Sequence, residues 1–212
     1  MFGTHDFLLF VLSGLLLNIT PGPDLIYIVS RSTSGGMGKG LVAVAGIGAG
    51  CLVHIVAASL GLSAILATSA MAFIVVKVVG AAYLVYVGLN SILSSSKGLA
   101  TKLNQVPSAV SRRKVFVQGF FTNALNPKVA LFFMAFLPQF ISPNASCKAG
   151  AFAFLGIVFW INGMIVCMLA AWLSARLASN LLGNRGIMRW FERCTGGLFV
   201  FLGIRLAMAE NA

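Results

Sequence analysis

Six long apolar stretches constrain this sequence more than any other feature, because each is long enough for a helix that crosses a bilayer. They occupy residues 7–30, 41–66, 71–93, 115–141, 149–175 and 190–209. A membrane-spanning helix needs about 20 predominantly apolar residues. Only 9% of the residues are charged, against roughly 25% in a soluble domain, so lipid must cover the apolar surface. The sequence predicts an all-α integral membrane protein with a single transmembrane domain over residues 1–212, and we expect the first stretch to stay in the mature chain.

Basic residues predict how the chain is oriented. Those in the loops on one side of the predicted helices are Arg31, Lys39, Lys97, Lys102, Arg112, Arg113, Lys114, Arg176, Arg185, Arg189 and Arg193, whereas the other side has Lys77, Lys148 and Arg205. Cytoplasmic loops carry the excess of Lys and Arg, so the first group is expected in the cytoplasm and both termini outside. The net charge of +11 is then explained by topology and by contact with the anionic headgroups of the lipid bilayer. We expect no binding to nucleic acid.

The two halves of the chain resemble each other. GLLLNITPGPD from Gly14 and GFFTNALNPKV from Gly119 share Gly-x-x-x-Asn followed by a proline. We therefore expect six hydrophobic helices as two three-helix repeats, residues 1–93 and 115–212, joined by a basic cytoplasmic loop over residues 94–114. Three spans per repeat turn the second copy upside down in the membrane. Inverted repeats of this kind hold the substrate site of many secondary transporters at their interface.

The first helix is predicted to be broken. Pro21 and Pro23 lack backbone N–H groups and push the residues before them away from helical geometry, so we expect unwinding around residues 19–22 and a new helix from Pro23. Asp24 follows at once and is the acidic residue farthest inside a predicted span. A carboxylate at such depth costs about 2.5 kcal/mol or more and is a functional candidate by default. The plainer alternative is a simple proline kink, which membrane helices tolerate.

A second break is predicted in the fourth helix, at NALNPK over residues 123–128. Asn126 suits a helix N-cap and Pro127 suits the first helical position. Lys128 is then a buried cation at the place that corresponds to Asp24, and we expect the two charges to face each other. The alternative is a purely structural ion pair that locks the repeats together.

The other side chains that could take part in transport or catalysis give weaker signals. His54 in the second stretch is a candidate proton relay, or equally a histidine hydrogen-bonded between helices. Gly46 and Gly50 are expected to serve helix packing. The cysteines form no Cys-x-x-Cys pair, and the chain has no GxxxxGK[ST] phosphate-binding motif. We therefore expect no cofactor and no metal ion, and transport driven by an ion gradient rather than by ATP.

Four of the stretches carry a family resemblance. With TPGPD in the first, GIGAGCLVHIVAASLGL in the second, KVVGAAYLVYVG in the third and NALNPKVALFFMAFLPQF in the fourth, the chain resembles the LysE/RhtB-type amino-acid exporters over nearly its whole length. The resemblance implies a multi-pass protein of the bacterial inner membrane that exports amino acids such as homoserine, threonine, leucine, lysine or arginine. The predicted substrate-binding residues are the family's motif positions Pro21, Gly22, Pro23, Asp24, Asn123, Asn126, Pro127 and Lys128, together with the neighbouring Asn18 and Thr20. Asp24 and His54 are the candidates for proton coupling.

We therefore expect a secondary active exporter rather than an enzyme. Because Lys128 already balances Asp24, a neutral amino acid such as homoserine, threonine or leucine is favoured over a cationic one, with proton antiport as the coupling. Two other classes stay open. A membrane-embedded enzyme or redox relay would need a convergent set of catalytic groups or thiols, and a passive channel would conduct without saturation or counter-transport. Small-residue helix faces also permit a homodimer.

Overall fold

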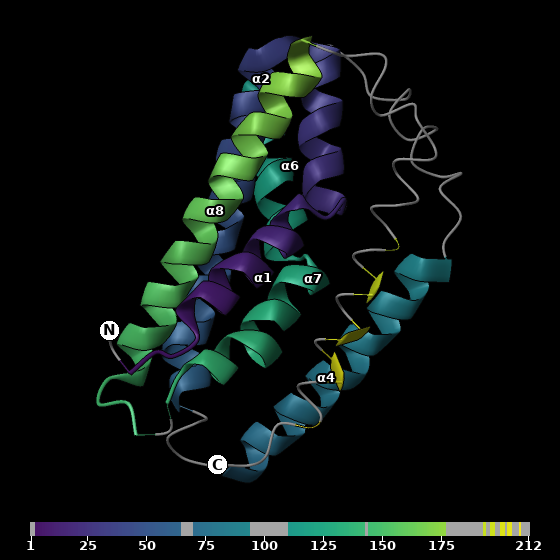
Figure 1. Cartoon of the computed structure of the whole chain (residues 1–212). Helices are drawn as coiled ribbons and strands as arrows, with labels where there is room; N and C mark the ends of the chain where they lie inside the picture. The colour runs from purple at the N-terminus through teal and green to yellow at the C-terminus, as the bar shows by residue number, and fades with distance from the viewer. Residues whose placement is uncertain are drawn as a thin grey trace.

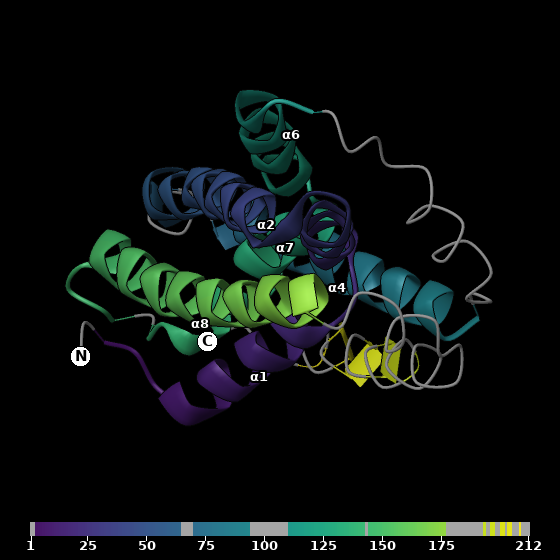
Figure 2. The same cartoon turned by 90° about the horizontal axis from the view of Figure 1, so that it is seen from above.

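The described part of the chain consists of helices and the short segments that join them, with one isolated β-bridge. The computed structural model describes residues 3–64, 70–93, 110–142 and 144–176, together with isolated positions between residues 193 and 208. The elements are α1 (Phe7–Ile19), α2 (Pro23–Ala57), the π-helical turn η1 (Ala58–Leu62), α4 (Ala70–Leu93), α6 (Arg112–Ala124), α7 (Pro127–Leu131), the π-helical turn η2 (Phe132–Phe136), the 3-10 turn η3 (Leu137–Phe140) and α8 (Lys148–Arg176). In Figures 1 and 2, α2, α6 and α8 run side by side, α1 crosses α8 obliquely and α4 stands at one edge.

These helices overlap the predicted apolar stretches, and some of them have the length of membrane spans. Within the described residues, Pro23–Leu62 and Lys148–Arg176 are each long and apolar enough to cross a bilayer. Arg112–Ala124 and Pro127–Phe140 make a third candidate if they are one span, bent by 41° at its break. Most of the predicted sixth helix lies outside the described residues. Its described positions, Arg193, Gly196, Gly197, Val200, Phe201, Gly203, Ile204 and Met208, are all helical.

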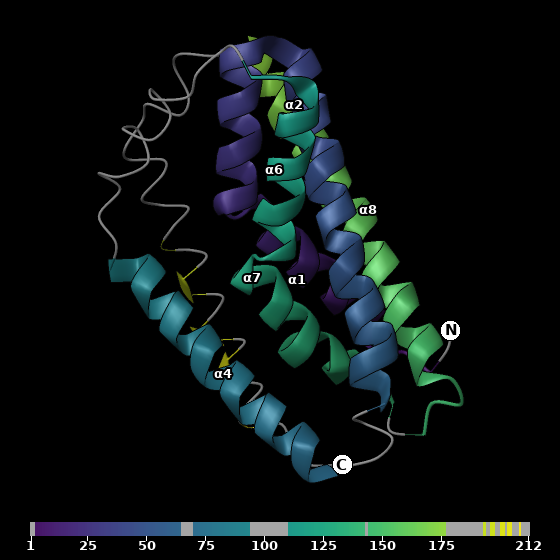
Figure 3. The same ribbon diagram turned by 180° about the vertical axis from the view of Figure 1, so that it is seen from behind.

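Gly36 divides α2 into two arms. Its backbone has φ 71° and ψ 179°, a conformation essentially restricted to glycine because a side chain would clash. Figure 3 shows the chain reversing direction there, so that residues 23–35 run toward the turn and the rest of α2 runs back. The first arm continues the predicted first stretch after its break. The second predicted stretch becomes helical directly after Gly36, a few residues before its expected start at residue 41.

The structure corrects part of the predicted loop assignment. Arg31 is not a loop residue but lies within the first arm of α2, with its side chain only 8% exposed. Residues 112–114, assigned to the central loop, form the first turn of α6. Lys97, Lys102, Arg185 and Arg189 lie outside the described residues. The orientation of the chain in the membrane therefore stays a prediction.

The predicted packing role of Gly46 and Gly50 is confirmed. Both glycines lie against the backbone of α6, and a Cβ atom built on Gly50 would stand 2.5 Å from the carbonyl oxygen of Phe120 and 2.9 Å from the nitrogen of Ala124. No side chain fits at those distances. The second arm of α2 and α6 are therefore in direct backbone contact, as small residues permit in membrane helix pairs.

Replacing Gly50 by alanine is expected to destabilise the protein by about 1–3 kcal/mol, because overpacking forces the two helices apart. The measurement is the apparent unfolding temperature of the purified protein in detergent. Gly61→Ala is the matched control, since a Cβ atom at Gly61 would meet nothing within 4 Å. Equal unfolding temperatures for the two variants would contradict the close contact.

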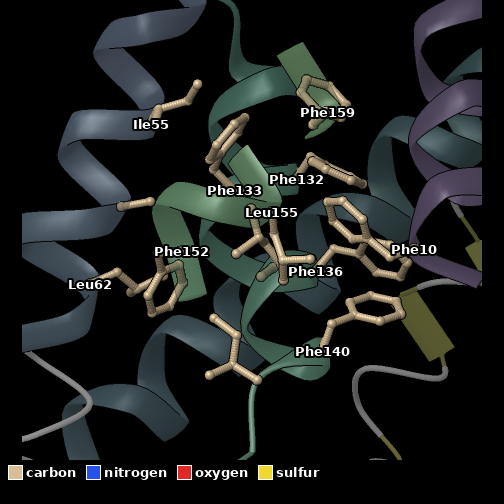
Figure 4. Close-up of a cluster of buried hydrophobic side chains, with 14 of the residues drawn as sticks. Phe10, Ile55, Leu62, Phe132, Phe133, Phe136, Phe140, Phe152, Leu155 and Phe159 are labelled. Carbon is tan, nitrogen blue, oxygen red and sulfur yellow. The ribbon is translucent and has the colours of Figure 1, made fainter. Parts of the chain in front are cut away.

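Phenylalanine rings fill one end of the bundle. The phenylalanine cluster, seen in Figure 4, consists of Phe10, Phe132, Phe133, Phe136, Phe140, Phe152 and Phe159. Its closest ring pairs are Phe132 with Phe159, at 4.6 Å between centroids, and Phe136 with Phe140, at 4.9 Å. Phe10 precedes the first break and residues 132–140 follow the second. The cluster thus lies between both breaks and the end of the molecule where Thr4 bridges to Ile141.

Candidate functional site

The two predicted breaks are present and lie against each other. Helix α1 ends at Ile19 and α2 begins at Pro23, while α6 ends at Ala124 and α7 begins at Pro127. The predicted unwinding around residues 19–22 is therefore confirmed. Each break leaves a helix C-terminus with carbonyl groups and a helix N-terminus with N–H groups that lack partners within the helix.

The second break is organised by its asparagine. The Asn126 side chain accepts a hydrogen bond of 3.0 Å from the backbone nitrogen of Lys128, and Pro127 is the first residue of α7. Both predictions for these residues are confirmed. The cap fixes the start of α7 and so the place from which the Lys128 side chain departs.

Asp24 is held by the amide groups of the opposite break. Its Oδ2 atom accepts hydrogen bonds of 2.9 Å from Asn123 and of 2.9 Å from Asn126. Its other carboxylate oxygen, Oδ1, is buried and has no hydrogen-bond partner, and the same is true of the Asn123 Oδ1 atom. Two buried acceptors therefore belong to neighbouring side chains at one place, and buried acceptors are rarely left unpaired.

Lys128 reaches in the opposite direction, from the second break to the first. Its ammonium group donates a hydrogen bond of 3.1 Å to the backbone carbonyl of Thr20. A Cβ atom at Gly22 would lie 3.3 Å from the Lys128 nitrogen, so the missing side chain at residue 22 makes room for the lysine. Each break thus supplies the partner for the charged residue of the other.

The predicted facing pair of Asp24 and Lys128 is only partly correct. Both side chains line the same cavity, but the ion pairs found within 4.0 Å among the described residues do not include this one. The reason is that the two asparagine amides hold the carboxylate while the Thr20 carbonyl holds the ammonium group. The two charges compensate each other across the cavity instead of in contact.

The cavity between the breaks has a volume of about 40 Å³. The predicted site residues that line it are Asn18, Thr20, Gly22, Asp24, Asn123 and Lys128. Pro21, Pro23 and Pro127 do not line it and act by shaping the two breaks. Asn126 does not line it either, but it both caps α7 and donates to Asp24. The structure therefore brings the predicted site together, with one group of residues facing the cavity and the other defining the backbone around it.

Helix α8 supplies a wall that the sequence interpretation missed. Phe159, Trp160, Gly163, Met164 and Cys167 all line the cavity. The Trp160 ring nitrogen donates a hydrogen bond of 3.0 Å to the carbonyl of Gly48, which fixes the indole beside the cavity. Cys51 of α2 also lines it, and both cysteines are free thiols. The largely apolar sequence of α8 gives no clear signal that one face of it meets the breaks.

His54 lies behind the site and not in it. Its Nε2 atom is 3.0 Å from the carbonyl oxygen of Asn123, and its ring stacks on Phe133 at 5.9 Å between centroids. The side chain is buried and is not among the residues that line the cavity. His54 therefore contacts the backbone of the asparagine that binds Asp24, one residue removed from the carboxylate.

The arrangement can bind a small molecule that carries both charges. Asp24 and Asn123 offer acceptors, Lys128 offers a donor, and the N-terminus of α2 adds N–H groups with positive potential. Leu17, Phe159 and Trp160 form an apolar wall of the same cavity. A zwitterion with a small apolar or hydroxylated side chain fits this distribution of groups.

Comparison with known proteins places the chain in a family. The model of the LysE type translocator family matches residues 15–210. A homoserine/homoserine lactone efflux protein of Salmonella typhimurium is 30% identical over 203 residues, which cover 96% of each chain. A leucine efflux protein of Klebsiella pneumoniae is 28% identical over 213 residues, covering 99% of this chain and 98% of the relative. A membrane protein of Vibrio cholerae is 31% identical over 208 residues, covering 97% and 98%.

No solved structure matches the chain. The family match extends over both breaks, the cavity that they enclose and the helix that walls it. On this match and on relatives that are similar over almost their full length, the chain belongs to the LysE-type translocator family.

Proposed function

We propose that this protein exports small neutral amino acids across the bacterial inner membrane by proton antiport. The observation that carries the proposal is the pair of buried, unpartnered acceptors on Asp24 and Asn123, in a cavity that also contains the Lys128 ammonium group. The names of two similar proteins refer to efflux of homoserine, homoserine lactone and leucine. The site and the family therefore support the same class of substrate.

The substrate's ammonium group is expected at Asp24. There it meets the Oδ1 atoms of Asp24 and Asn123, both of which lack a partner. The substrate's carboxylate is expected on the other side of the cavity, at Lys128 and the N-terminus of α2, where charge-assisted hydrogen bonds are available. At about 10–15 Å³ for each water molecule, the cavity of about 40 Å³ holds only about three or four waters, so it must widen to bind an amino acid, and a compact one such as homoserine or threonine needs the least widening.

Charge in the cavity favours a substrate with a neutral side chain over one with a cationic side chain. Asp24 is the acidic residue that lines the cavity, and Lys128 compensates it. Lysine or arginine would bring a second positive charge, on the side chain, which would need a second carboxylate because an unpaired charge is costly at membrane depth. Asp6, the other acidic residue among those described, is exposed and lies at the far end of α1.

Proton antiport is proposed because Asp24 can be neutralised in two ways. When the ammonium group of the substrate leaves, a proton on Oδ1 can replace it, and His54 can influence this exchange through the Asn123 backbone. The membrane potential contributes about 2.3 kcal/mol per charge and per 100 mV. The chain has no phosphate-binding motif, so the driving force is assigned to a gradient.

The proposed architecture is two inverted repeats of three helices, residues 1–93 and 115–212, with a basic cytoplasmic loop between them. The reciprocal contacts support it, since each half contributes one broken helix and one charged residue that binds the other break. The contacts of Gly88 in α4 with Gly196 near the C-terminus also fit, because they join the third helices of the two halves. In this arrangement the substrate binds at the repeat interface.

The test is efflux from proteoliposomes that contain the purified protein under an imposed pH gradient. We expect saturable, gradient-dependent efflux of labelled homoserine, threonine or leucine, and little efflux of lysine. Collapse of the gradient with a protonophore is expected to abolish uphill transport. Efficient saturable export of lysine alone would overturn the neutral substrate, and unchanged uphill export after collapse would overturn proton coupling. Flux that does not saturate and needs no counter-transport would identify a channel.

A further inference from the structure

Arg31 is a buried cation that has no role in the export cycle proposed above. Its side chain is 8% exposed, and its Nη2 atom donates a hydrogen bond of 2.9 Å to the Oε1 atom of Gln118. Its Nε atom is buried and has no partner. Within the described residues no carboxylate forms an ion pair with it. A guanidinium group in this setting can donate further hydrogen bonds to an anion.

Tyr27 completes the surroundings of the guanidinium group. The Arg31 guanidinium carbon lies 5.3 Å from the centre of the Tyr27 ring, a cation–π distance. The Tyr27 hydroxyl donates to the Val115 carbonyl at 2.7 Å and lies 3.5 Å from the Gln118 Oε1 atom. We call Tyr27, Arg31 and Gln118 the arginine cluster. Among the described residues the hydrogen bond and the cation–π contact of Arg31 are with neutral groups, so they orient the positive charge without compensating it.

The arginine cluster lies on the helices that carry Asp24 and Asn123, displaced from the cavity toward Gly36, and none of its three residues lines the cavity. Asp24, Tyr27 and Arg31 follow one another on the first arm of α2 with the spacing of a single helix face. Arginine side chains on a helix lean toward its N-terminus, which places the guanidinium group over Tyr27, about one turn from Asp24. Gln118 comes from α6, the same helix that supplies Asn123. The cluster and the Asp24 site thus share both of their helices.

The free donors of Arg31 match a carboxylate. A guanidinium group binds carboxylates in a two-pronged geometry, whereas a lysine ammonium group acts as a point charge. An arginine that only filled space would leave its charge uncompensated in a buried place, which is costly.

We propose that Tyr27, Arg31 and Gln118 form a carboxylate-binding station through which the substrate passes between the cytoplasm and Asp24. The inference rests on the proposed export function, whose orientation places the Gly36 turn on the cytoplasmic side. At this station Arg31 binds the carboxylate through the donors that Gln118 leaves free. Lys128 holds the carboxylate only after the substrate has reached the central cavity.

The test compares homoserine with homoserine lactone, which has the same carbon skeleton and ammonium group but no carboxylate. Counterflow is measured with proteoliposomes that contain either the wild-type protein or the variant. Relative to the wild type, Arg31→Gln is expected to raise the KM for homoserine roughly tenfold or more and to leave the KM for the lactone almost unchanged. A tenfold change corresponds to the loss of one charge-assisted interaction. Arg176→Gln is the matched control, because it removes an exposed arginine that stacks on Trp172 outside the site.

Gln118→Glu gives a second test, which does not require the protein to fold without Arg31. The new carboxylate occupies the guanidinium group permanently, so we expect a higher unfolding temperature together with a weaker affinity for homoserine and an unchanged one for the lactone. A purely structural arginine predicts the higher stability without the change in affinity.

Each result separates the station from the export function. Equal effects of Arg31→Gln on homoserine and on the lactone would overturn the carboxylate assignment, as would wild-type homoserine affinity in a stabilised Gln118→Glu variant. If the wild-type protein moves neither homoserine nor the lactone nor any neutral amino acid, the proposed function itself fails. The decisive result is therefore the difference between the effects of each variant on homoserine and on the lactone, and not a loss of activity as such.

Discussion

Replacing Asp24 by asparagine is expected to reduce proton-driven export at least a hundredfold, which corresponds to about 2.7 kcal/mol at 1.36 kcal/mol per factor of ten. The amide has the shape of the carboxylate, and its oxygen can still accept the bonds that Asn123 and Asn126 donate at 2.9 Å. The fold is therefore expected to survive. The variant loses the negative charge that attracts the ammonium group of the substrate. It also loses the carboxylate oxygen that can bind a proton when the ammonium group leaves. The measurement is initial efflux of labelled homoserine under a pH gradient.

Two comparisons make this result specific. Asp6→Asn is the matched control, because it removes an exposed acidic residue at the beginning of α1 and should leave export unchanged. Counterflow without a gradient then separates the two roles of Asp24. A variant that exchanges substrate but cannot use the gradient has lost its proton carrier, whereas loss of both activities shows that substrate binding is affected. Normal gradient-driven export by Asp24→Asn would refute the site.

The breaks could be predicted from the sequence because their cause is local. A proline removes its own N–H group and restricts the residue before it, whatever the rest of the chain does. The same holds for the cap at Asn126, which depends on a contact with Lys128 only two residues away. The predicted unwinding around residues 19–22, the new helix from Pro23 and the start of α7 at Pro127 are accordingly confirmed.

The contacts between the breaks could not be predicted, because they depend on the three-dimensional packing. The sequence indicates that Asp24 and Lys128 are buried charges at corresponding places. It does not indicate that asparagine side chains will reach the carboxylate before the lysine does. The contribution of α8 is hidden for a related reason. Trp160 and Met164 are ordinary residues of an apolar helix until the fold brings them to the cavity.

Arg31 was misplaced because the residues around it read as a loop. The run SRSTSGG is rich in serine, threonine and glycine, which are typical of turns. In the structure the hydroxyl groups bond to the helix backbone instead. Ser30 donates to the Ile26 carbonyl and Ser32 to the Ile28 carbonyl, each at 2.8 Å. These bonds to the carbonyl four residues earlier satisfy the hydroxyls within the helix. A polar segment can therefore stay helical and carry a buried arginine.

Exchanging the two charges, Asp24→Lys together with Lys128→Asp, is expected to fail as a rescue. If the residues formed a direct ion pair, the exchange would restore it. In the structure each charge has a partner of its own, so a lysine at residue 24 would face the amide donors of Asn123 and Asn126. An aspartate at residue 128 would face the Thr20 carbonyl, another acceptor. Asn126 cannot turn its oxygen toward the new lysine without giving up the cap of α7.

We therefore expect each single change to cost about 3 kcal/mol or more, since it leaves a buried charge without compensation. The double variant is expected to be no more stable than the worse single variant. The measurement is a double-mutant cycle of unfolding temperatures in detergent, in which a direct pair would give a large favourable coupling. Lys128→Met serves as the comparison that removes a charge without introducing the opposite one. Recovery of stability and export by the exchanged pair would show that Asp24 and Lys128 meet directly during the transport cycle. Failure would show that asparagine amides and a backbone carbonyl hold the two charges, and that the two breaks are joined through them.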